Sequence, residues 1–240
     1  MTTATASGRR RGPDFELLRG VPVFEGLPPS ALEDLLAAME RRVFRKGDLV
    51  FTQGEKVERL YVLEHGRVEV FKSDITGKRL TLWFAKAGDA FCLGNLFSES
   101  AFANALARQD SVALGIGRED LFRALRKEAG LIHRFVACIS RRLAAYAEIV
   151  ETLAFRSVQQ RLAAFLWRCV SLDCTKEMTC TVTRSEMASL LGTRREVVSR
   201  ALRRLGTAGI IELVPSGKAR HAKVLDPDRL EAVARGDLSL

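Results

Sequence analysis

The sequence is organised around one stretch, residues 182–205, which reads VTRSEMASLLGTRREVVSRALRRL. Its pattern predicts two short helices. Thr183 with Glu186, and Thr193 with Glu196, have the spacing of capping boxes, in which two side chains bond the free backbone N–H groups at a helix start. Both boxes precede apolar residues at helical spacing, so each marks the start of one helix.

A tight turn is expected between these two helices. Gly192 supplies the backbone freedom that a sharp turn needs, and Ala188 is small where two crossing helices must approach. The apolar residues that the helices can share are Leu190, Leu191, Val198, Ala201, Leu202 and Leu205. The residues left on the outside of the second helix are Arg194, Arg195, Glu196, Ser199, Arg200, Arg203 and Arg204.

This combination fits a helix-turn-helix whose second helix enters the major groove of DNA. The alternative for a basic helix is a solvated face, but here the turn glycine, the small alanine and both caps fall at helix-turn-helix spacing. A following hairpin is predicted from two apolar runs joined through residues 215–217, and it would form a wing behind the second helix. The predicted DNA-binding residues are Thr183, Arg184, Thr193, Arg194, Arg195, Glu196, Ser199, Arg200, Lys218 and Arg220.

The charge distribution supports this interpretation. The 240 residues carry a net charge of +9. Residues 156–225 hold 13 Lys and Arg against 5 Asp and Glu, so this segment accounts for +8 of that charge. Binding to phosphate requires such a local surplus.

Composition also limits where the protein acts. No apolar run approaches the roughly 20 residues of a membrane span, and no apolar segment follows the basic Arg9–Arg11 patch as it would in a secretory signal. We therefore expect a cytoplasmic protein without a membrane partner. The five cysteines, an odd number, fit reduced thiols in that compartment.

A β-rich region is expected from residue 43 to residue 116. Short runs rich in branched and aromatic residues occur at 49–51, 60–63, 68–71 and 80–84, with glycines between them. This spacing is typical of a β-sandwich or barrel.

A helical period returns after this region and continues as a heptad pattern. Apolar residues alternate at spacings of four and three, at Ile132, Val136, Ile139, Leu143, Tyr146, Val150 and Leu153. The pattern predicts a coiled-coil dimer interface. A second stripe, Leu131, Phe135, Cys138 and Ile149, can pack the same helix on its own barrel, and the two can hold on different faces.

The predicted organisation is therefore α+β. We expect a disordered tail at residues 1–13, a β-barrel sensor domain at 14–128, a dimerisation helix at 129–155 and a winged helix-turn-helix domain at 156–240. A dimer suits such a DNA reader, because two half-sites raise both affinity and specificity.

This order of parts resembles the catabolite activator/FNR (Crp/Fnr) family of bacterial transcription regulators. The likeness covers about residues 20–230 and rests on Gly54-Glu55, 60–63, Gly77-Lys78 and Gly88-Asp89 in the barrel, and on 153–155, 161–163 and 183–205 after it. It implies a jelly-roll barrel like those that bind cyclic nucleotides, and an effector bound there that sets the pose of the recognition helices. It also implies a homodimer on a palindromic operator in double-stranded DNA, with RNA polymerase as a partner.

The sensor motifs depart from the cyclic-AMP-binding members of that family. Cys92-Leu93 stands in place of their Gly-Glu pair, residues 101–104 in place of their Arg-Ser pair, and Tyr146-Ala147 where small hydroxyl residues read the base. Only Arg108 remains as a candidate phosphate partner. We therefore expect an unidentified small-molecule effector other than cyclic AMP. From the family's geometry, its pocket would be formed by Phe91, Cys92, Asn95, Asn104 and Tyr146.

The sequence leaves two other functions to consider. One is a redox- or haem-dependent regulator of the same fold that uses Cys92 or one of the three histidines. An iron–sulfur cluster held by N-terminal cysteines is excluded, since no cysteine precedes Cys92, and Cys169, Cys174 and Cys180 lack the close pairs of common metal sites. The other is an enzyme, but no catalytic triad, metal-ligand or phosphate-loop signature is present. We expect no catalytic residue and no metal site, and the sequence identifies no cofactor.

Overall fold

The computed structural model describes residues 12–171, 179–180, 182–216 and 219–240. Its contacts divide the chain into two compact units. The first consists of Met1–Val70 with Trp83–Leu143, and the second of Phe71–Leu82 with Ala144–Leu240. Each unit is described by itself.

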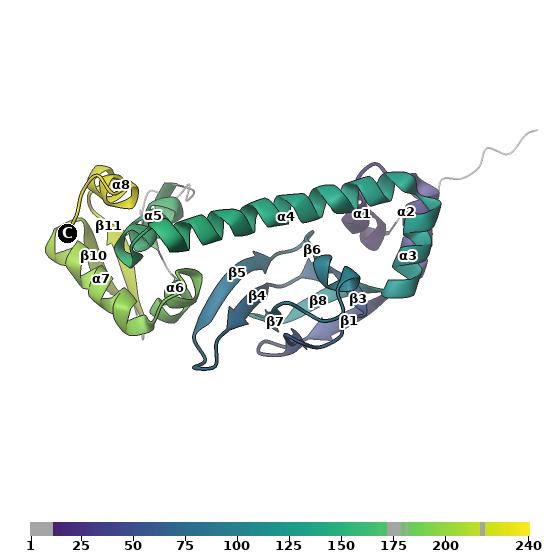
Figure 1. Cartoon of the computed structure of the whole chain (residues 1–240), viewed down its shortest axis with the longest axis horizontal. Coiled ribbons are helices and arrows are strands. Elements are labelled where there is room, and N and C mark those ends of the chain that lie inside the picture. The colour runs from purple at the N-terminus through teal and green to yellow at the C-terminus, as the bar shows by residue number, and fades with distance from the viewer. Residues whose placement is uncertain (1–11, 172–178, 181, 217–218) are drawn as a thin grey trace, which may run out of the picture. The chain divides into compact units, whose positions relative to one another are not determined.

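Two four-stranded sheets form the β-rich part of the chain (Figure 1). One has the order β1-β8-β3-β6 and the other the order β2-β7-β4-β5. The strands are β1 (Met39–Phe44), β2 (Leu49–Phe51), β3 (Arg59–His65), β4 (Val68–Ser73), β5 (Arg79–Ala85), β6 (Ala90–Phe91), β7 (Asn104–Ala107) and β8 (Ser111–Gly117). The four sequence runs that predicted strands correspond to β2, β3, β4 and β5.

A glycine fixes the turn between β3 and β4. Gly66 has a φ of +105°, and a Cβ added there would lie 2.6 Å from the Ser111 Cα. Only glycine fits so close an approach in a left-handed conformation. The Ser111 hydroxyl lies at the same turn and accepts a hydrogen bond of 3.2 Å from the Arg67 N–H.

Helices close the core of the first unit. They are α1 (Pro13–Arg19), α2 (Pro29–Ala37), the 3₁₀ helix η1 (Gly94–Phe97) and α3 (Arg118–Lys127). Phe15 and Leu18 of α1 are buried with Phe24 and with Leu60 of β3. Ser30 and Glu33 have the spacing of a capping box in the sequence, which predicts that Ser30 caps this helix. This prediction is wrong, because α2 begins at Pro29, with Pro28 at the N-cap and no side-chain cap.

The long helix α4 (Ala129–Phe155) runs without interruption for 27 residues (Figure 1). Its Leu131 and Phe135 are buried in the core of the first unit, and Cys138 packs against that core. The predicted packing stripe is thus confirmed for these three residues. Within the described part of the chain, no helix is both long and apolar enough to span a membrane.

The second unit contains α5 (Val158–Ser171), β9 (Thr179–Cys180), α6 (Arg184–Leu190), α7 (Arg195–Thr207), β10 (Ile211–Ser216), β11 (Ala219–Val224) and α8 (Pro227–Arg235). Its core joins Leu162 and Leu166 of α5 with Leu202 of α7 and Leu230 of α8. β10 and β11 form the expected antiparallel hairpin, and β9 adds a third strand. The arrangement of a β-rich region, a long helix and a helix-turn-helix confirms the predicted fold, while the exact domain boundaries stay predictions.

Candidate DNA-binding and effector sites

The first helix of the helix-turn-helix starts at the predicted capping box. The Glu186 N–H donates to the Thr183 hydroxyl at 3.2 Å, and the Thr183 N–H donates to the Glu186 carboxylate at 3.1 Å. Met187 and Ala188 are buried on the inner side of this helix. The box therefore fixes where α6 begins, and Ala188 allows the close helix approach that its small size predicted.

The turn between α6 and α7 is held by backbone and side-chain bonds. Gly192 has a φ of +59°, and the Thr193 N–H donates to the Ala188 carbonyl at 2.9 Å. Arg161 of α5 donates from its guanidinium to the Leu191 carbonyl at 2.8 Å. Burial of this guanidinium lowers the pKa of Arg161. In the sequence, Arg161 is only part of a motif shared with the family, and no local pattern predicts its bond to the turn.

The second capping box is wrong. Helix α7 begins at Arg195, its N-cap is Arg194, and no side chain caps it. Thr193 lies one residue too early, because its N–H is still bonded within the turn. The Glu196 side chain therefore projects from the first turn of α7 without serving a cap.

The outer face of α7 is basic and accessible. Arg194, Arg195, Glu196 and Arg200 are exposed, as are Arg203 and Arg204. Ser199, Thr193 and Arg184 are half-buried, and Thr183 is exposed. On the opposite side of α7, Val198 and Leu202 are fully buried. The predicted DNA-binding residues of α6, the turn and α7 therefore lie on α7 or next to it. The opposite face of α7 packs in the core of the second unit.

The two predicted wing contacts are less defined. Lys218 lies outside the described residues. Arg220 belongs to β11, where its backbone pairs with Pro215 of β10. The position of Arg220 in the hairpin agrees with a wing, and its contact with phosphate stays a prediction.

The heptad stripe of α4 is uncovered in the single chain. Leu143 is 67% exposed and Val150 is 66% exposed. Ile132, Val136, Ile139 and Leu153 are also exposed, and Tyr146 is half-buried. Water-exposed apolar side chains in one continuous stripe mark an interaction surface.

Four of the five predicted effector residues lie in the first unit. Phe91, Cys92, Asn95 and Asn104 are all buried there, whereas Tyr146 belongs to the second unit. The Asn104 side-chain oxygen accepts a bond of 3.0 Å from the Gln53 N–H, and the Asn95 oxygen accepts one of 3.5 Å from the Phe102 N–H. The Asn104 amide therefore holds the loop that follows β2, and the Asn95 amide holds the segment that follows η1.

Cys92 has two unusual properties. It is the one described non-glycine residue with positive φ, at 74°. Burial also raises the pKa of its thiol well above the usual range. The neighbouring Phe91 ring stacks on Tyr61 with centroids 5.4 Å apart. The thiol is therefore protonated and enclosed, which opposes nucleophilic or redox chemistry.

Arg108, the candidate phosphate partner, is directed to a carboxylate. Its Nε lies 3.6 Å from the Glu69 carboxylate, and Glu69 is almost completely buried. Within the described residues, no group of three His, Cys, Asp or Glu side chains is placed to hold a metal.

Comparison with known protein families assigns both halves of the chain. Residues 41–128 match the model of the cyclic nucleotide-binding domain, and residues 160–233 match the Crp-like helix-turn-helix domain. The chain belongs to the Crp/Fnr family. Members of this family are transcription regulators, not enzymes, and they bind DNA and typically dimerise.

Similar proteins extend along most of the chain. A cyclic AMP receptor protein of Thermus thermophilus is 29% identical over 211 residues, which cover 87% of this chain and 97% of that protein. A CRP-like cAMP-activated global transcriptional regulator of Mycobacterium tuberculosis is 26% identical over 226 residues, which cover 92% of this chain and 99% of that protein. The structure of the c-di-GMP-responsive regulator CLP of Xanthomonas campestris has a TM-score of 0.72 at 23% identity, over 82% of this chain and 99% of that one, and shows the shared fold.

Proposed function

We propose that this Crp/Fnr regulator is a homodimer that binds a two-fold symmetric operator through α7 and responds to an effector other than cyclic AMP. The observation that carries the DNA-binding part is the two-sided character of α7. Its inner face is buried in the core, and its outer face presents five exposed arginines, at 194, 195, 200, 203 and 204. A recognition helix needs this arrangement, because it must be rigidly held and basic where it meets phosphate.

The exposed heptad stripe supports the dimer. Pairing the stripes of two chains along α4 would remove these apolar side chains from water, which is favourable in proportion to the area buried. A two-fold axis along α4 would also give the dimer two recognition helices. RNA polymerase is then the expected partner at promoters.

Base readout is assigned to Arg195, Glu196 and Arg200. Residues 196 and 200 lie one helical turn apart on the same face, and both are exposed. Arginine forks suit guanine, and a carboxylate accepts from the amino group of cytosine. Glu196 repels phosphate and does not cap α7, so reading a base remains its simplest role. The expected half-site contains G·C pairs and resembles TGTGA.

The argument against cyclic AMP comes from the site residues, although two relatives are named for cyclic AMP. Residues 101–104 fall where the cyclic-AMP-binding members of the family carry Arg-Ser, and Leu93 falls where they carry a glutamate. Arg108 is already paired with Glu69. A cyclic phosphate would lack the charged partner that a buried anion needs.

A redox- or haem-dependent regulator is the second candidate. The enclosed Cys92 thiol does not favour it, and His65 and His133 are exposed on the surface. An ultraviolet–visible spectrum of protein purified without oxygen separates the two candidates. A Soret or charge-transfer band would favour the haem or redox sensor, and a featureless spectrum above 300 nm would favour the small-molecule effector.

Two measurements test the proposal as a whole. Selection of binding sites from random DNA should return palindromes with half-sites about one helical turn apart. Calorimetry with cyclic AMP at millimolar concentration should give no binding isotherm. Recovery of non-palindromic sites would contradict the dimeric reader, and a micromolar isotherm would contradict the effector assignment.

A further inference from the structure

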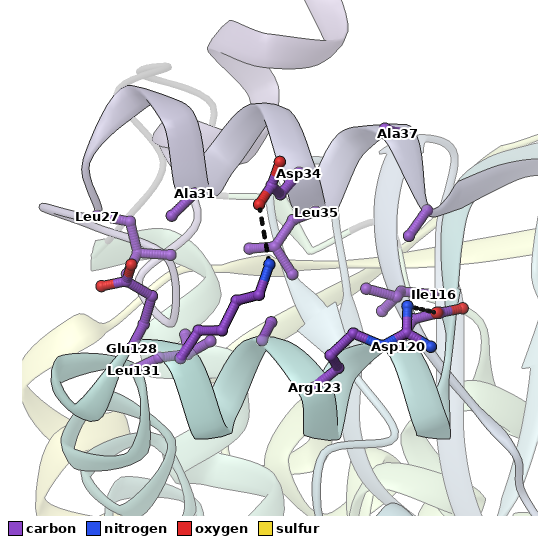
Figure 2. Close-up of a pocket in the computed structure, with 13 residues that line it drawn as sticks. Leu27, Ala31, Asp34, Leu35, Ala37, Ile116, Asp120, Arg123, Glu128 and Leu131 are labelled. Atoms are coloured by element: carbon purple, nitrogen blue, oxygen red, sulfur yellow. Dashed lines mark ion pairs between the residues drawn. The ribbon is translucent and has the colours of Figure 1, made fainter.

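A cavity of about 230 Å³ lies between α2 and α3 in the first unit (Figure 2). It is separate from the α7 surface and shares no residue with the predicted effector pocket. Its walls come from α2, α3, the end of β8 and the first turns of α4. The space exists because Ala31 and Ala38 on one side and Ala124 on the other are too short to fill it.

The floor of this cavity is apolar. Leu27, Leu35, Ile116 and Leu131 line it, and all four are buried in the core of the first unit. Such a floor favours an apolar body, since its burial removes hydrocarbon from water on both sides.

The rim carries both signs of charge. The Lys127 ammonium lies 3.5 Å from the Asp34 carboxylate and so connects α3 to α2 across the cavity (Figure 2). Arg123 pairs with Asp120 at 2.9 Å within α3. Glu128 reaches from the end of α3 toward Leu27, and its carboxylate makes no ion pair within the described residues (Figure 2).

The ion pair between Lys127 and Asp34 can be replaced by contacts with a ligand. The side chains of Lys127 and Asp34 are 64% and 71% exposed, so water screens their attraction and little holds them together. A ligand with its own positive and negative groups could separate the pair and satisfy each partner. The unpaired Glu128 adds a second carboxylate for a cation.

The size and the charges select the ligand class. The volume lies below the roughly 300–1,000 Å³ of sites for drug-sized ligands, so a nucleotide is too large. We infer that this cavity binds an apolar α-amino acid as the zwitterion, with its ammonium beside Asp34 and Glu128, its carboxylate beside Lys127, and its side chain on the apolar floor. The two charges of an α-amino acid are about as close together as those of the bridging pair.

Calorimetric titration of the full-length protein with L-leucine tests this directly, and it requires neither DNA nor the other effector. Three probes remove one feature each: isoamylamine lacks the carboxylate, 4-methylpentanoate lacks the ammonium, and glycine lacks the apolar body. We expect L-leucine to bind at least tenfold more tightly than each of them. No measurable binding of L-leucine at millimolar concentration, or equal binding of any one probe, would overturn the inference.

Variants locate the site. Glu128→Gln and Lys127→Gln should each weaken L-leucine binding at least tenfold. Their matched controls, Glu119→Gln and Arg126→Gln, change the same charges on exposed positions of α3 outside the cavity and should leave it unchanged. Ala31→Leu, which fills the cavity, should abolish binding in a protein whose circular dichroism and melting temperature match the parent. If both charge variants bind like the parent, the amino acid lies elsewhere and the assignment is wrong.

Discussion

The guanidinium carbon of Arg142 lies 3.4 Å from the centroid of the Trp83 ring. Arg142 belongs to α4 and Trp83 to β5, so this contact joins the long helix to the sheet within the first unit. An arginine stacked on an indole contributes about 0.5–1 kcal/mol at an exposed site. The fluorescence of Trp83 should therefore report on the position of α4. It can be measured separately, because the chain contains only one other tryptophan, Trp167.

In a Trp167→Phe background, Arg142→Ala should shift the emission of Trp83 to longer wavelength, since the guanidinium no longer covers the ring. Arg141→Ala is the control, because Arg141 bonds Cys138 instead. Steady-state fluorescence measures both. An unchanged spectrum in Arg142→Ala would show that the stack is not formed in solution.

Leu143→Asp should convert the dimer to monomers with weak DNA binding, because two like charges would face each other in the heptad seam. Sedimentation velocity at micromolar concentration gives the oligomeric state. Arg141→Asp places the same side chain away from the seam and should stay dimeric. A parent protein that sediments as a monomer would contradict the seam itself.

Glu196→Ala should weaken the free energy of binding to the preferred operator by about 1–3 kcal/mol and reduce the specificity at one base pair. Site selection from random DNA with parent and variant measures this. Lys218→Ala serves as the contrast. It should weaken binding to all DNA sequences about equally, and it should lower the slope of the logarithm of the binding constant against the logarithm of the salt concentration by about 1 in magnitude. Identical base preferences of the parent and Glu196→Ala would rule out the readout role.

Arg161→Met should lower the free energy of unfolding by about 1–3 kcal/mol, because the Leu191 carbonyl loses its donor at the helix-turn-helix turn. Arg168→Met changes an exposed arginine of the same helix and should have little effect. Denaturant unfolding followed by circular dichroism compares them. Equal losses in the two variants would show that the bond to the turn is not the cause.

Cys92 should be inert in the native protein. The parent and Cys92→Ala should release the same amount of thiol-reactive dye product at pH 8, and they should differ only after denaturation. Because burial raises the pKa of this thiol above its unfolded value of about 8.5, its contribution to stability is present below that pH and is lost as pH rises. The parent should therefore lose more stability between pH 7.5 and 10 than Cys92→Ala does. A dye reaction at Cys92 in the folded protein would instead favour the redox sensor.

Local patterns in the sequence predicted the parts that depend on local geometry. The Thr183 box, the Gly192 turn and the two stripes of α4 were readable because each repeats a spacing fixed by the helix itself. The Thr193 box is wrong although its spacing fits, because the turn engages the Thr193 N–H and delays the start of α7 by one residue. At α2 the prolines override Ser30, since a proline at the first helical position is already preorganised to start a helix.

The effector region was harder because its determinants are not local. The family resemblance predicts Asn95 and Asn104 as ligand contacts, yet each accepts a bond from a backbone N–H, that of Phe102 for Asn95 and that of Gln53 for Asn104. The Arg108–Glu69 pair joins residues 39 positions apart and is visible only once the strands are aligned. Helices α1 and α8 were not predicted, because both are short and lie in segments with little periodic sequence.

The exposed stripe on α4 also has a consequence for dosage. A regulator whose active form is a pair of chains is assembled in a step that depends on the square of chain concentration. At expression levels below the dissociation constant of the pair, doubling the amount of protein should raise the active species nearly fourfold. The cell can therefore obtain a steep threshold in promoter occupancy from the abundance of this one chain, with no change in any ligand.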